Sequence, residues 1–375
     1  IGDSTEPAAV HDLEQGLRLD RTLFVSAAKS GTTLETSALT GHFLGRCRAA
    51  LGHVEDGRRF VAITDEGSAL ERDARELGFR AIVHGEPDIG GRFSALSAFG
   101  LLPPWLVGVD PEPVVAAGAR AAEACSPQVT VADNPAARLA ALLAAAVGQG
   151  RDKLAVLVSE QFAALGDWVE QLVAESTGKD GRGVLPVVGH PLERQHWSGP
   201  DRVLVALGES GDAGLAEATE WALARGAPMA RMEVPGPSDL GAAFFVWELA
   251  TAVLGHLLGV QPFDQPDVEA AKVRARRGLE AYRVAGRLEL PQPSLVEGPV
   301  TLTAAGSHAS VADALGWLCD ATEPGPGRYI AVQAFLPPRP EVRRALERVK
   351  EETTVREELR RGSTSREVWE RYHIL

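Results

Sequence analysis

Short apolar runs alternate with helical patterns along the N-terminal part of the chain. Strands are predicted at Leu23–Val25, Phe60–Thr64 and Arg80–Val83, and helices at about Thr32–Leu51 and Ser68–Leu77. Short buried strands that alternate with helices are typical of βαβ units, in which the strands run parallel. The pattern therefore predicts a first α/β domain, and its early first strand suggests that an N-terminal strand and helix are missing.

A mostly helical, Ala-rich stretch from Pro103 to Gln149 leads into a second alternation of the same kind. The elements expected there are strands at Leu154–Val158, Val184–Val188, Val203–Leu207 and Met229–Val234, and helices at Glu160–Glu175, Ala213–Arg225 and Asp239–Leu258. The two halves repeat an architecture and not a sequence. Together they predict an α/β fold of two flavodoxin-like, three-layer domains with mainly parallel sheets and helices on both faces.

The C-terminal part reads differently. It is expected to hold a helix near Asp267–Arg277, a Pro- and Gly-containing connector at Leu288–Gly298, a short strand at Tyr329–Phe335 and a charged helix from Glu341 to about Arg361. The predicted domains are therefore 1–128, 129–290 and a C-terminal α/β extension at 291–375.

Composition narrows the classes of partner. The net charge of −13 excludes nucleic acid as a partner, since phosphate backbones require basic surfaces. No membrane partner is expected either, because no apolar run approaches the roughly 18–20 residues of a membrane span. Three well-separated cysteines, Cys47, Cys125 and Cys319, lack the spacing of a metal or disulfide motif and indicate the cytoplasm.

A group of small polar residues directly follows the first predicted strand, in the stretch Ser26–Thr36. Thr32 and Glu35 form a capping-box pattern, so a helix is expected to begin there and to present unpaired backbone N–H groups. The side-chain donors beside these N–H groups are Lys29, Ser30, Thr32 and Thr33. The arrangement suits a phosphate, although a well-capped helix without a ligand explains it equally well.

Two further stretches could carry chemistry. In Asp88–Ser94, two glycines precede Arg92, and they permit unusual backbone angles and the close approach of an anion to the guanidinium. The alternative is a Gly-Gly turn with a surface arginine. In Phe263–Lys272, a loop leads into a helix that carries one lysine, which by itself is ordinarily solvated.

Four motifs in order give a resemblance. They are Lys29–Thr36 (KSGTTLET), Gly90–Ser94 (GGRFS), Glu175–Lys179 (ESTGK) and Phe263–Lys272 (FDQPDVEAAK). Together they resemble the glucose-6-phosphate isomerase family, whose domains are of the sugar isomerase (SIS) type. The compact form is similar to the isomerase half of bacterial transaldolase–isomerase fusion proteins.

The resemblance implies a role for each matching residue. Lys29, Ser30, Thr32 and Thr33 fall on the sugar-phosphate loop. Arg92 falls on the arginine that stabilises the enediolate, Lys272 on the lysine implicated in opening the sugar ring, and Gln265 on a neighbouring substrate contact. The resemblance further implies sugar phosphates as partners, no metal or redox cofactor, a homodimer with sites near its interface, and room for a fused or separate transaldolase.

The chain differs from the family at the position of the catalytic base. His190 stands in a Gly-His-Pro segment where the family carries its catalytic glutamate. Three alternatives stay open: His190 is the base, the nearby Glu193 replaces it, or the site has no effective base. The first two predict an isomerase acting on glucose 6-phosphate and fructose 6-phosphate. The third predicts a non-catalytic phosphosugar-binding protein on the same fold.

Smaller departures surround the site. Ala27 and Ala28 stand where the family usually has serines, which removes a hydroxyl donor near the phosphate. The separate catalytic histidine of the family has no clear match, and His256 and His308 are candidates by residue type only. The tail after about Thr353 also differs from that of the fusion proteins.

Overall fold

The computed structural model describes residues 2, 4–52, 57–188, 199–288, 291–321, 334–337, 339–346 and 348, with the backbone only at 266–270 and 319–321. The chain divides into two compact units, Ile1–Asp264 and Gln265–Leu375. The first unit contains both predicted sheets. The domain boundaries expected at 128 and 290 stay a prediction.

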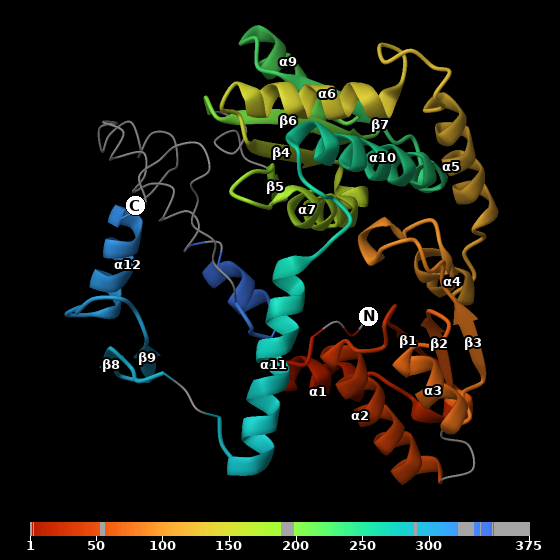
Figure 1. The fold of residues 1–375 in the computed structure, drawn as a ribbon, viewed down its shortest axis with the longest axis vertical. Helices are drawn as coiled ribbons and strands as arrows, with labels where there is room; N and C mark the ends of the chain where they lie inside the picture. Colours follow the sequence, from red (N-terminus) through yellow and green to blue (C-terminus); the bar gives the residue numbers. More distant parts are fainter. Residues whose placement is uncertain are drawn as a thin grey trace. The chain divides into compact units, whose positions relative to one another are not determined.

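The first sheet is parallel, as predicted, with the strand order β1-β2-β3. Its elements are α1 (Pro7–Gln15), β1 (Phe24–Ala27), α2 (Leu34–Leu51), β2 (Phe60–Thr64), α3 (Ala69–Glu76) and β3 (Ala81–His84). The central strand β2 is buried at every position. Helix α2 packs Phe43, Leu44 and Cys47 against Phe60, and α3 packs Leu70 and Ala74 against Ala62. Figure 1 shows both helices alongside this sheet.

The second sheet is also parallel, with the order β5-β4-β6-β7. The remaining elements of this unit are α4 (Ala98–Leu106), α5 (Glu112–Ala124), α6 (Pro135–Gly148), β4 (Lys153–Val158), α7 (Ala163–Thr177), β5 (Leu185–Val188), β6 (Arg202–Gly208), α9 (Ala213–Ala224), β7 (Met229–Glu233) and α10 (Leu240–Leu258). Because β4 lies between β5 and β6, the chain switches direction across the sheet after β5. In open α/β sheets, ligands bind at the carboxyl ends of the strands around such a point.

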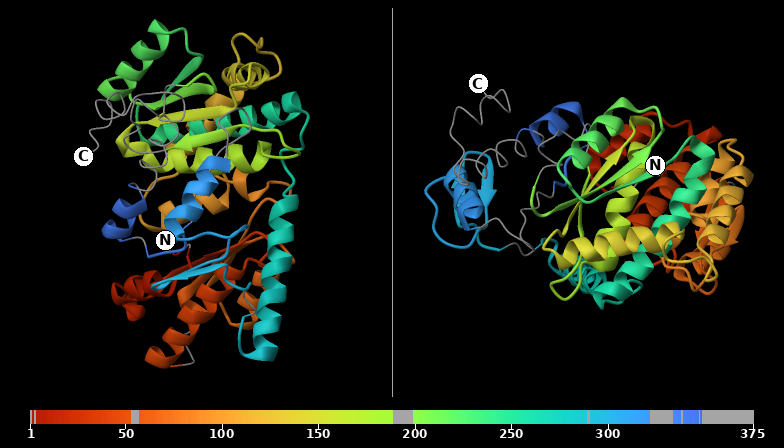
Figure 2. Two further views of the ribbon diagram at one scale, coloured as in Figure 1. Left: turned by 90° about the vertical axis from the view of Figure 1, so that its left-hand side faces the viewer. Right: turned by 90° about the horizontal axis from the view of Figure 1, so that it is seen from above.

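Strand residues of the second sheet alternate between two cores. Leu154, Val156, Val203 and Val205 pack with α6, α7 and α10, whereas the intervening Ala155, Leu157, Leu204 and Ala206 pack with α9. This alternation, with a helix layer on either face, confirms the predicted three-layer arrangement for the second sheet (Figure 2).

Helix α10 corrects the expectation that no apolar run approaches the length of a membrane span. With the 3₁₀ turn η5 (Pro237–Asp239) it forms an apolar helix, Pro237–Leu258, of 22 residues and mean hydropathy 1.5, which is long enough to cross a membrane by length and composition. Its fully buried Trp247 and Leu254 belong to the larger core, and the helix packs against α5, α6 and α7. These contacts are those of a core helix.

Helices α5 and α10 cross at two glycines. A Cβ atom added to Gly241 would lie 1.8 Å from the carbonyl oxygen of Val114, and one added to Gly118 would lie 3.3 Å from that of Gly241 and 2.9 Å from Cδ1 of Leu96. The two backbones therefore touch directly, and the side chain of Leu96 rests on the crossing.

The second unit contains α11 (Pro266–Ala285), β8 (Leu295–Glu297), β9 (Val300–Leu302) and α12 (Val311–Ala321). The helix expected near Asp267–Arg277 is confirmed and is longer than predicted. The expected connector instead ends in an antiparallel β8–β9 hairpin, which is mostly exposed and was missed because its strands have three residues each. Of the strand expected at Tyr329–Phe335, residues 329–333 lie outside the described residues.

Candidate functional site

The polar loop after β1 leads into α2 at Leu34, with Thr33 as the N-cap residue. The predicted capping box is wrong, because Thr33 makes no side-chain cap bond and the hydroxyl of Thr32 instead pairs with that of Ser30 at 2.8 Å. Gly31 has φ +65, and a Cβ there would lie 2.3 Å from the backbone nitrogen of Leu70. The glycine is thus required by close packing on α3.

Lys29 joins this loop to two others. Its ammonium group donates to a carboxylate oxygen of Asp65 at 2.7 Å and to the carbonyl oxygens of Glu86 and Pro87 at 2.8 and 3.2 Å. Asp65 follows β2, and Glu86 and Pro87 lie in the loop after β3 that leads to Arg92. The carboxyl ends of all three strands of the first sheet are therefore connected through one lysine.

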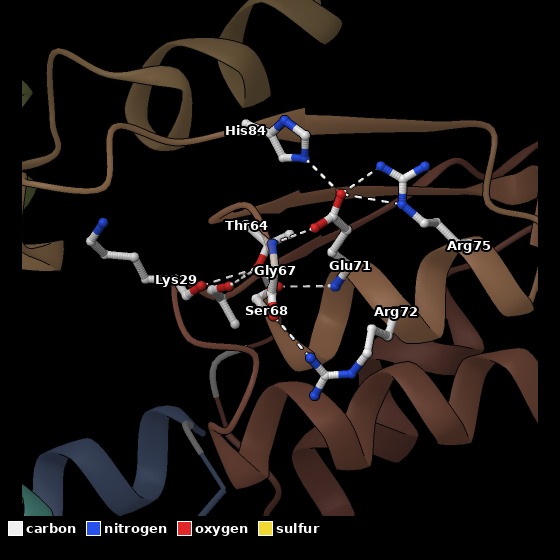
Figure 3. A network of polar contacts seen from close by, with 9 residues as sticks. Lys29, Thr64, Gly67, Ser68, Glu71, Arg72, Arg75 and His84 are labelled. Atoms are coloured by element: carbon white, nitrogen blue, oxygen red, sulfur yellow. Dashed lines mark hydrogen bonds and ion pairs between the residues drawn. The ribbon is translucent and has the colours of Figure 1, made fainter.

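A second network holds the loop after β2 (Figure 3). The hydroxyl of Thr64 donates to the carbonyl oxygen of Ala28 and pairs with the hydroxyl of Ser68, both at 2.7 Å. The buried carboxylate of Glu71 accepts hydrogen bonds from Arg75, from the N–H of Gly67 and from His84. The bonds from Arg75 and Gly67 lower the pKa of Glu71 to about 2, against the opposing effect of burial.

Arg92 lies in the 3₁₀ turn η3 (Gly91–Phe93) and its side chain is 3% exposed. Nη1 donates to the hydroxyl of Ser176 and to the carbonyl oxygen of Pro262, and Nη2 donates to that of Asp264 at 3.1 Å. Nε lies 3.4 Å from the carboxylate of Glu175. Burial lowers the pKa of Arg92, while the carboxylates of Glu175 and Asp264 act in the opposite direction.

These contacts correct two expectations about the Gly-Gly-Arg stretch. The alternative of a surface arginine is wrong, since the guanidinium is buried and joins its own turn to two distant segments, the end of α7 and the segment after α10. The expectation of unusual backbone angles at the glycines is also wrong, because neither Gly90 nor Gly91 has a positive φ. A Cβ at either glycine would meet no described atom within 4 Å, so the backbone of the turn is open at both glycines.

The Glu175–Lys179 motif supplies the groups that surround Arg92. Glu175 and Ser176 contact the guanidinium from the last turn of α7. The ammonium of Lys179 donates to the carbonyl oxygens of Gln261 and Asp264 and, at 2.6 Å, to the Asp264 carboxylate. The motif thus fixes both Arg92 and the segment that follows α10.

Replacing Lys179 with methionine should destabilise the protein. Hydrogen bonds to charged groups are worth about 1.5–3 kcal/mol, and this nearly buried ammonium serves three acceptors. We expect a loss of about 2 kcal/mol, read from denaturant unfolding. Asp264→Asn is the matched control, because it removes only the negative charge of one acceptor, on a side chain that is 55% exposed, and keeps an amide oxygen that can accept. Equal stability of Lys179→Met and the wild type would contradict the role.

The other predicted site residues are placed as follows. Gln265 precedes α11 and Lys272 lies within it, and both belong to the second unit. His190 and Glu193 lie outside the described residues, after β5 ends at Val188. His256 is exposed in the last turn of α10, and His308 contacts the carbonyl oxygen of Ala305 at 2.8 Å and the carboxylate of Asp313 at 3.7 Å.

Sequence reasoning missed the partners of the two cations. Asp65 could have been found, because an acidic residue directly follows the apolar strand β2. Glu175 and Ser176 were recognised as part of a motif without a role, and only their contact with Arg92 supplies one. Within the described ranges, no group of three or more His, Cys, Asp or Glu residues is placed to hold a metal ion.

Comparison with known proteins gives consistent relatives, although no family model matches the chain. A "Probable glucose-6-phosphate isomerase" of Natronomonas pharaonis is 33% identical over 315 residues, which cover 74% of this chain and 72% of that protein. The glucose-6-phosphate isomerase of Rubrobacter xylanophilus is 30% identical over 326 residues, which cover 76% and 75%.

Two solved structures share the fold. A hypothetical protein from Thermus thermophilus has a TM-score of 0.67 and 28% identity, over 74% of this chain and 76% of that one. A glucose-6-phosphate isomerase from Chlamydia trachomatis has a TM-score of 0.63 and 21% identity, over 74% and 63%, and this likeness concerns the fold.

Proposed function

Because this chain belongs to the glucose-6-phosphate isomerase family, we propose that it interconverts glucose 6-phosphate and fructose 6-phosphate through an enediolate. The observation that carries the proposal is Arg92, a fixed and buried cation beside an open Gly-Gly turn. Aldose–ketose isomerisation moves a proton between adjacent carbons, so negative charge develops on oxygen in the transition state. A cation held in place before the reaction stabilises that charge without reorganisation.

The remaining roles follow the chemistry of each group. Backbone N–H groups at the start of α2 and the hydroxyls of Ser30, Thr32 and Thr33 are proposed to bind the phosphate, with Lys29 adding a positive charge. Lys272 is proposed to act in ring opening and Gln265 to contact the substrate. His190 is proposed as the base, since a neutral imidazole can accept the proton. The homodimer and the transaldolase partner stay predictions from the resemblance, and the cytoplasmic location stays a prediction from the cysteine pattern.

One observation favours a second function, that of a non-catalytic protein that binds sugar phosphates. The family's base position holds His190, and a base that is displaced or missing leaves a protein that binds sugar phosphates without turning them over. A coupled turnover assay with fructose 6-phosphate, run beside calorimetric binding, separates the two. Turnover supports the isomerase, and binding without turnover above background supports the non-catalytic protein. If the protein neither binds fructose 6-phosphate nor turns it over, both proposed functions are wrong.

Replacing Thr33 with valine should weaken the binding of fructose 6-phosphate by about 10–100-fold, because a lost hydrogen bond to a charged group costs about 1.5–3 kcal/mol. The fold should persist, since the Thr33 side chain makes no cap bond in α2. Isothermal calorimetry measures the affinity. Ser37→Ala is the control, because that hydroxyl donates to the carbonyl oxygen of Thr33. Unchanged affinity in Thr33→Val would remove the phosphate from this loop.

A further inference from the structure

The loop proposed to bind the phosphate carries its donors at exposed positions. Within this phosphate loop (residues 28–33), Ser30 and Thr32 are exposed and their hydroxyls pair with each other, while Thr33 makes no side-chain cap bond. Donors that are not held in place before binding must be ordered by the ligand, and this ordering lowers the affinity. The contacts that hold the phosphate loop therefore bear on how well it binds.

The start of the phosphate loop is attached to the end of strand β2. The N–H of Ala28 donates to the carbonyl oxygen of Ile63 at 3.0 Å, and the N–H of Asp65 donates to that of Lys29 at 3.1 Å. Between these two bonds lies Thr64, which is fully buried. Its hydroxyl donates to the carbonyl oxygen of Ala28 at 2.7 Å and lies 3.1 Å from that of Lys29.

The hydrogen bonds on the other side of Thr64 lead to helix α3 and have a fixed direction. The N–H of Glu71 donates to the hydroxyl of Ser68 at 3.0 Å, and the hydroxyls of Ser68 and Thr64 lie 2.7 Å apart (Figure 3). Thr64 uses its one hydroxyl hydrogen on the Ala28 carbonyl, which can only accept. Ser68 must therefore donate to Thr64, and one ordered chain of hydrogen bonds runs from the first turn of α3 to the phosphate loop.

Helix α3 also supports the phosphate loop by direct contact. A Cβ atom at Gly31 would lie 2.3 Å from the backbone nitrogen of Leu70, so the two backbones touch. The start of α3 is held in turn by the carboxylate of Glu71, which accepts hydrogen bonds from Arg75 and from the N–H of Gly67. The loop thus rests on a turn that is itself fixed.

We propose that Thr64 is a positioning residue for phosphate binding. Its hydroxyl, oriented by Ser68, holds the phosphate loop against α3 and so keeps the N–H and hydroxyl donors of the loop in the arrangement that binds phosphate. Because Thr64 is fully buried behind the loop, it acts through the loop and not by contact with the substrate. This role rests on the proposed function, which places the phosphate at this loop.

The test compares Thr64→Val, which keeps the branched shape and removes the hydroxyl, with Thr64→Ser, which keeps the hydroxyl. Calorimetry with fructose 6-phosphate and with inorganic phosphate should show about tenfold weaker binding of both in Thr64→Val, the equivalent of one lost hydrogen bond. Thr64→Ser should bind both as the wild type does. Thr219→Val is the matched control, because that hydroxyl donates to the carbonyl oxygen of Leu215 within α9, and it should leave both affinities unchanged.

Steady-state kinetics supply a readout that general destabilisation would not move. Thr64→Val should raise KM for fructose 6-phosphate about tenfold and leave kcat close to that of the wild type, because the phosphate is bound equally in the ground state and the transition state. A variant that is merely less stable would lose active enzyme, and hence kcat, at an unchanged KM. Hydrogen exchange of the peptide 26–33 should be faster in Thr64→Val and should match the wild type in Thr64→Ser.

Wild-type affinity in Thr64→Val, or an equal loss in Thr64→Val and Thr64→Ser, would overturn the positioning role and leave the proposed isomerase standing. A wild type that binds neither fructose 6-phosphate nor inorganic phosphate would instead defeat the proposed function, and the role of Thr64 with it. If Thr64→Val does not fold, Ser68→Ala and Ser68→Thr replace the pair. Alanine removes the hydroxyl that orients Thr64 and should bind phosphate about threefold more weakly than threonine at this position, and equal affinities would refute the proposal.

Discussion

Arg92→Ala should lower kcat by about 10²–10³-fold, the usual loss on removal of one preorganised group that stabilises an oxyanion. It should also lower the free energy of unfolding by about 3–5 kcal/mol, because it breaks a buried pair and leaves Glu175 without its arginine. Steady-state kinetics and denaturant unfolding measure the two effects.

The substitution Arg92→Lys separates the effect of the positive charge from the effect of the planar shape of the guanidinium. A lysine keeps the charge but cannot present the planar fork that reaches Ser176, Pro262 and Asp264 together. We expect kcat to fall at least about tenfold, with a clear loss of stability. A freely exposed arginine would have given no such loss.

Arg231→Lys is the matched control for Arg92→Lys. Arg231 donates to the carbonyl oxygens of Glu209 and Ser210 at 3.2 and 3.1 Å from strand β7, and it has no role in the proposed chemistry. Its substitution should leave kcat unchanged. An Arg92→Lys enzyme with the wild-type kcat would refute the role of Arg92 at the oxyanion.

The second large effect is expected at His190. If this residue is the base, His190→Ala should lower kcat/KM by about 10²–10⁴-fold. The wild-type kcat/KM should rise with pH around the ordinary histidine pKa of about 6.5, since only the neutral imidazole accepts a proton. His190→Glu should keep or improve activity and should move the rising limb to lower pH, toward the carboxylate range.

Glu193→Gln completes the comparison at the base position. Full activity in His190→Ala together with loss in Glu193→Gln would transfer the role to Glu193. Binding of fructose 6-phosphate without turnover in the wild type would instead favour the non-catalytic protein. Recovery of activity in His190→Glu would then identify the base as the missing group.

The sequence predicted the strands well, for a physical reason. Strand β2 begins with four apolar residues, Phe60–Ile63, bounded by polar ones, and a parallel strand buried on both faces requires such a run. The hairpin β8–β9 offers no such signal, because its few residues are mostly exposed. The start of α2 was misjudged because Ser30, only two residues away, satisfies the hydroxyl of Thr32 in place of the predicted cap.

The sequence allowed the residues of the candidate site to be predicted, but not the contacts between them. The motifs pointed to Arg92, yet its hydrogen-bond partners Ser176, Pro262 and Asp264 are 84, 170 and 172 residues away along the chain. Local patterns carry no information on such distant pairs, because only the packing of the two sheets within the first unit brings them together. The burial of Arg92 follows from that packing.

The glycine crossing of α5 and α10 limits how this protein can evolve. Most core positions accept a different apolar side chain when neighbours repack. At Gly241 the nearest neighbours are backbone atoms of Val114 and Gly118, and backbone cannot repack around an added methyl group. Even alanine at Gly241 would force the two helices apart. Substitutions elsewhere in the core, including Gly118 with its neighbour Leu96, can be compensated by a change in an adjacent side chain, whereas Gly241 has no adjacent side chain that could compensate.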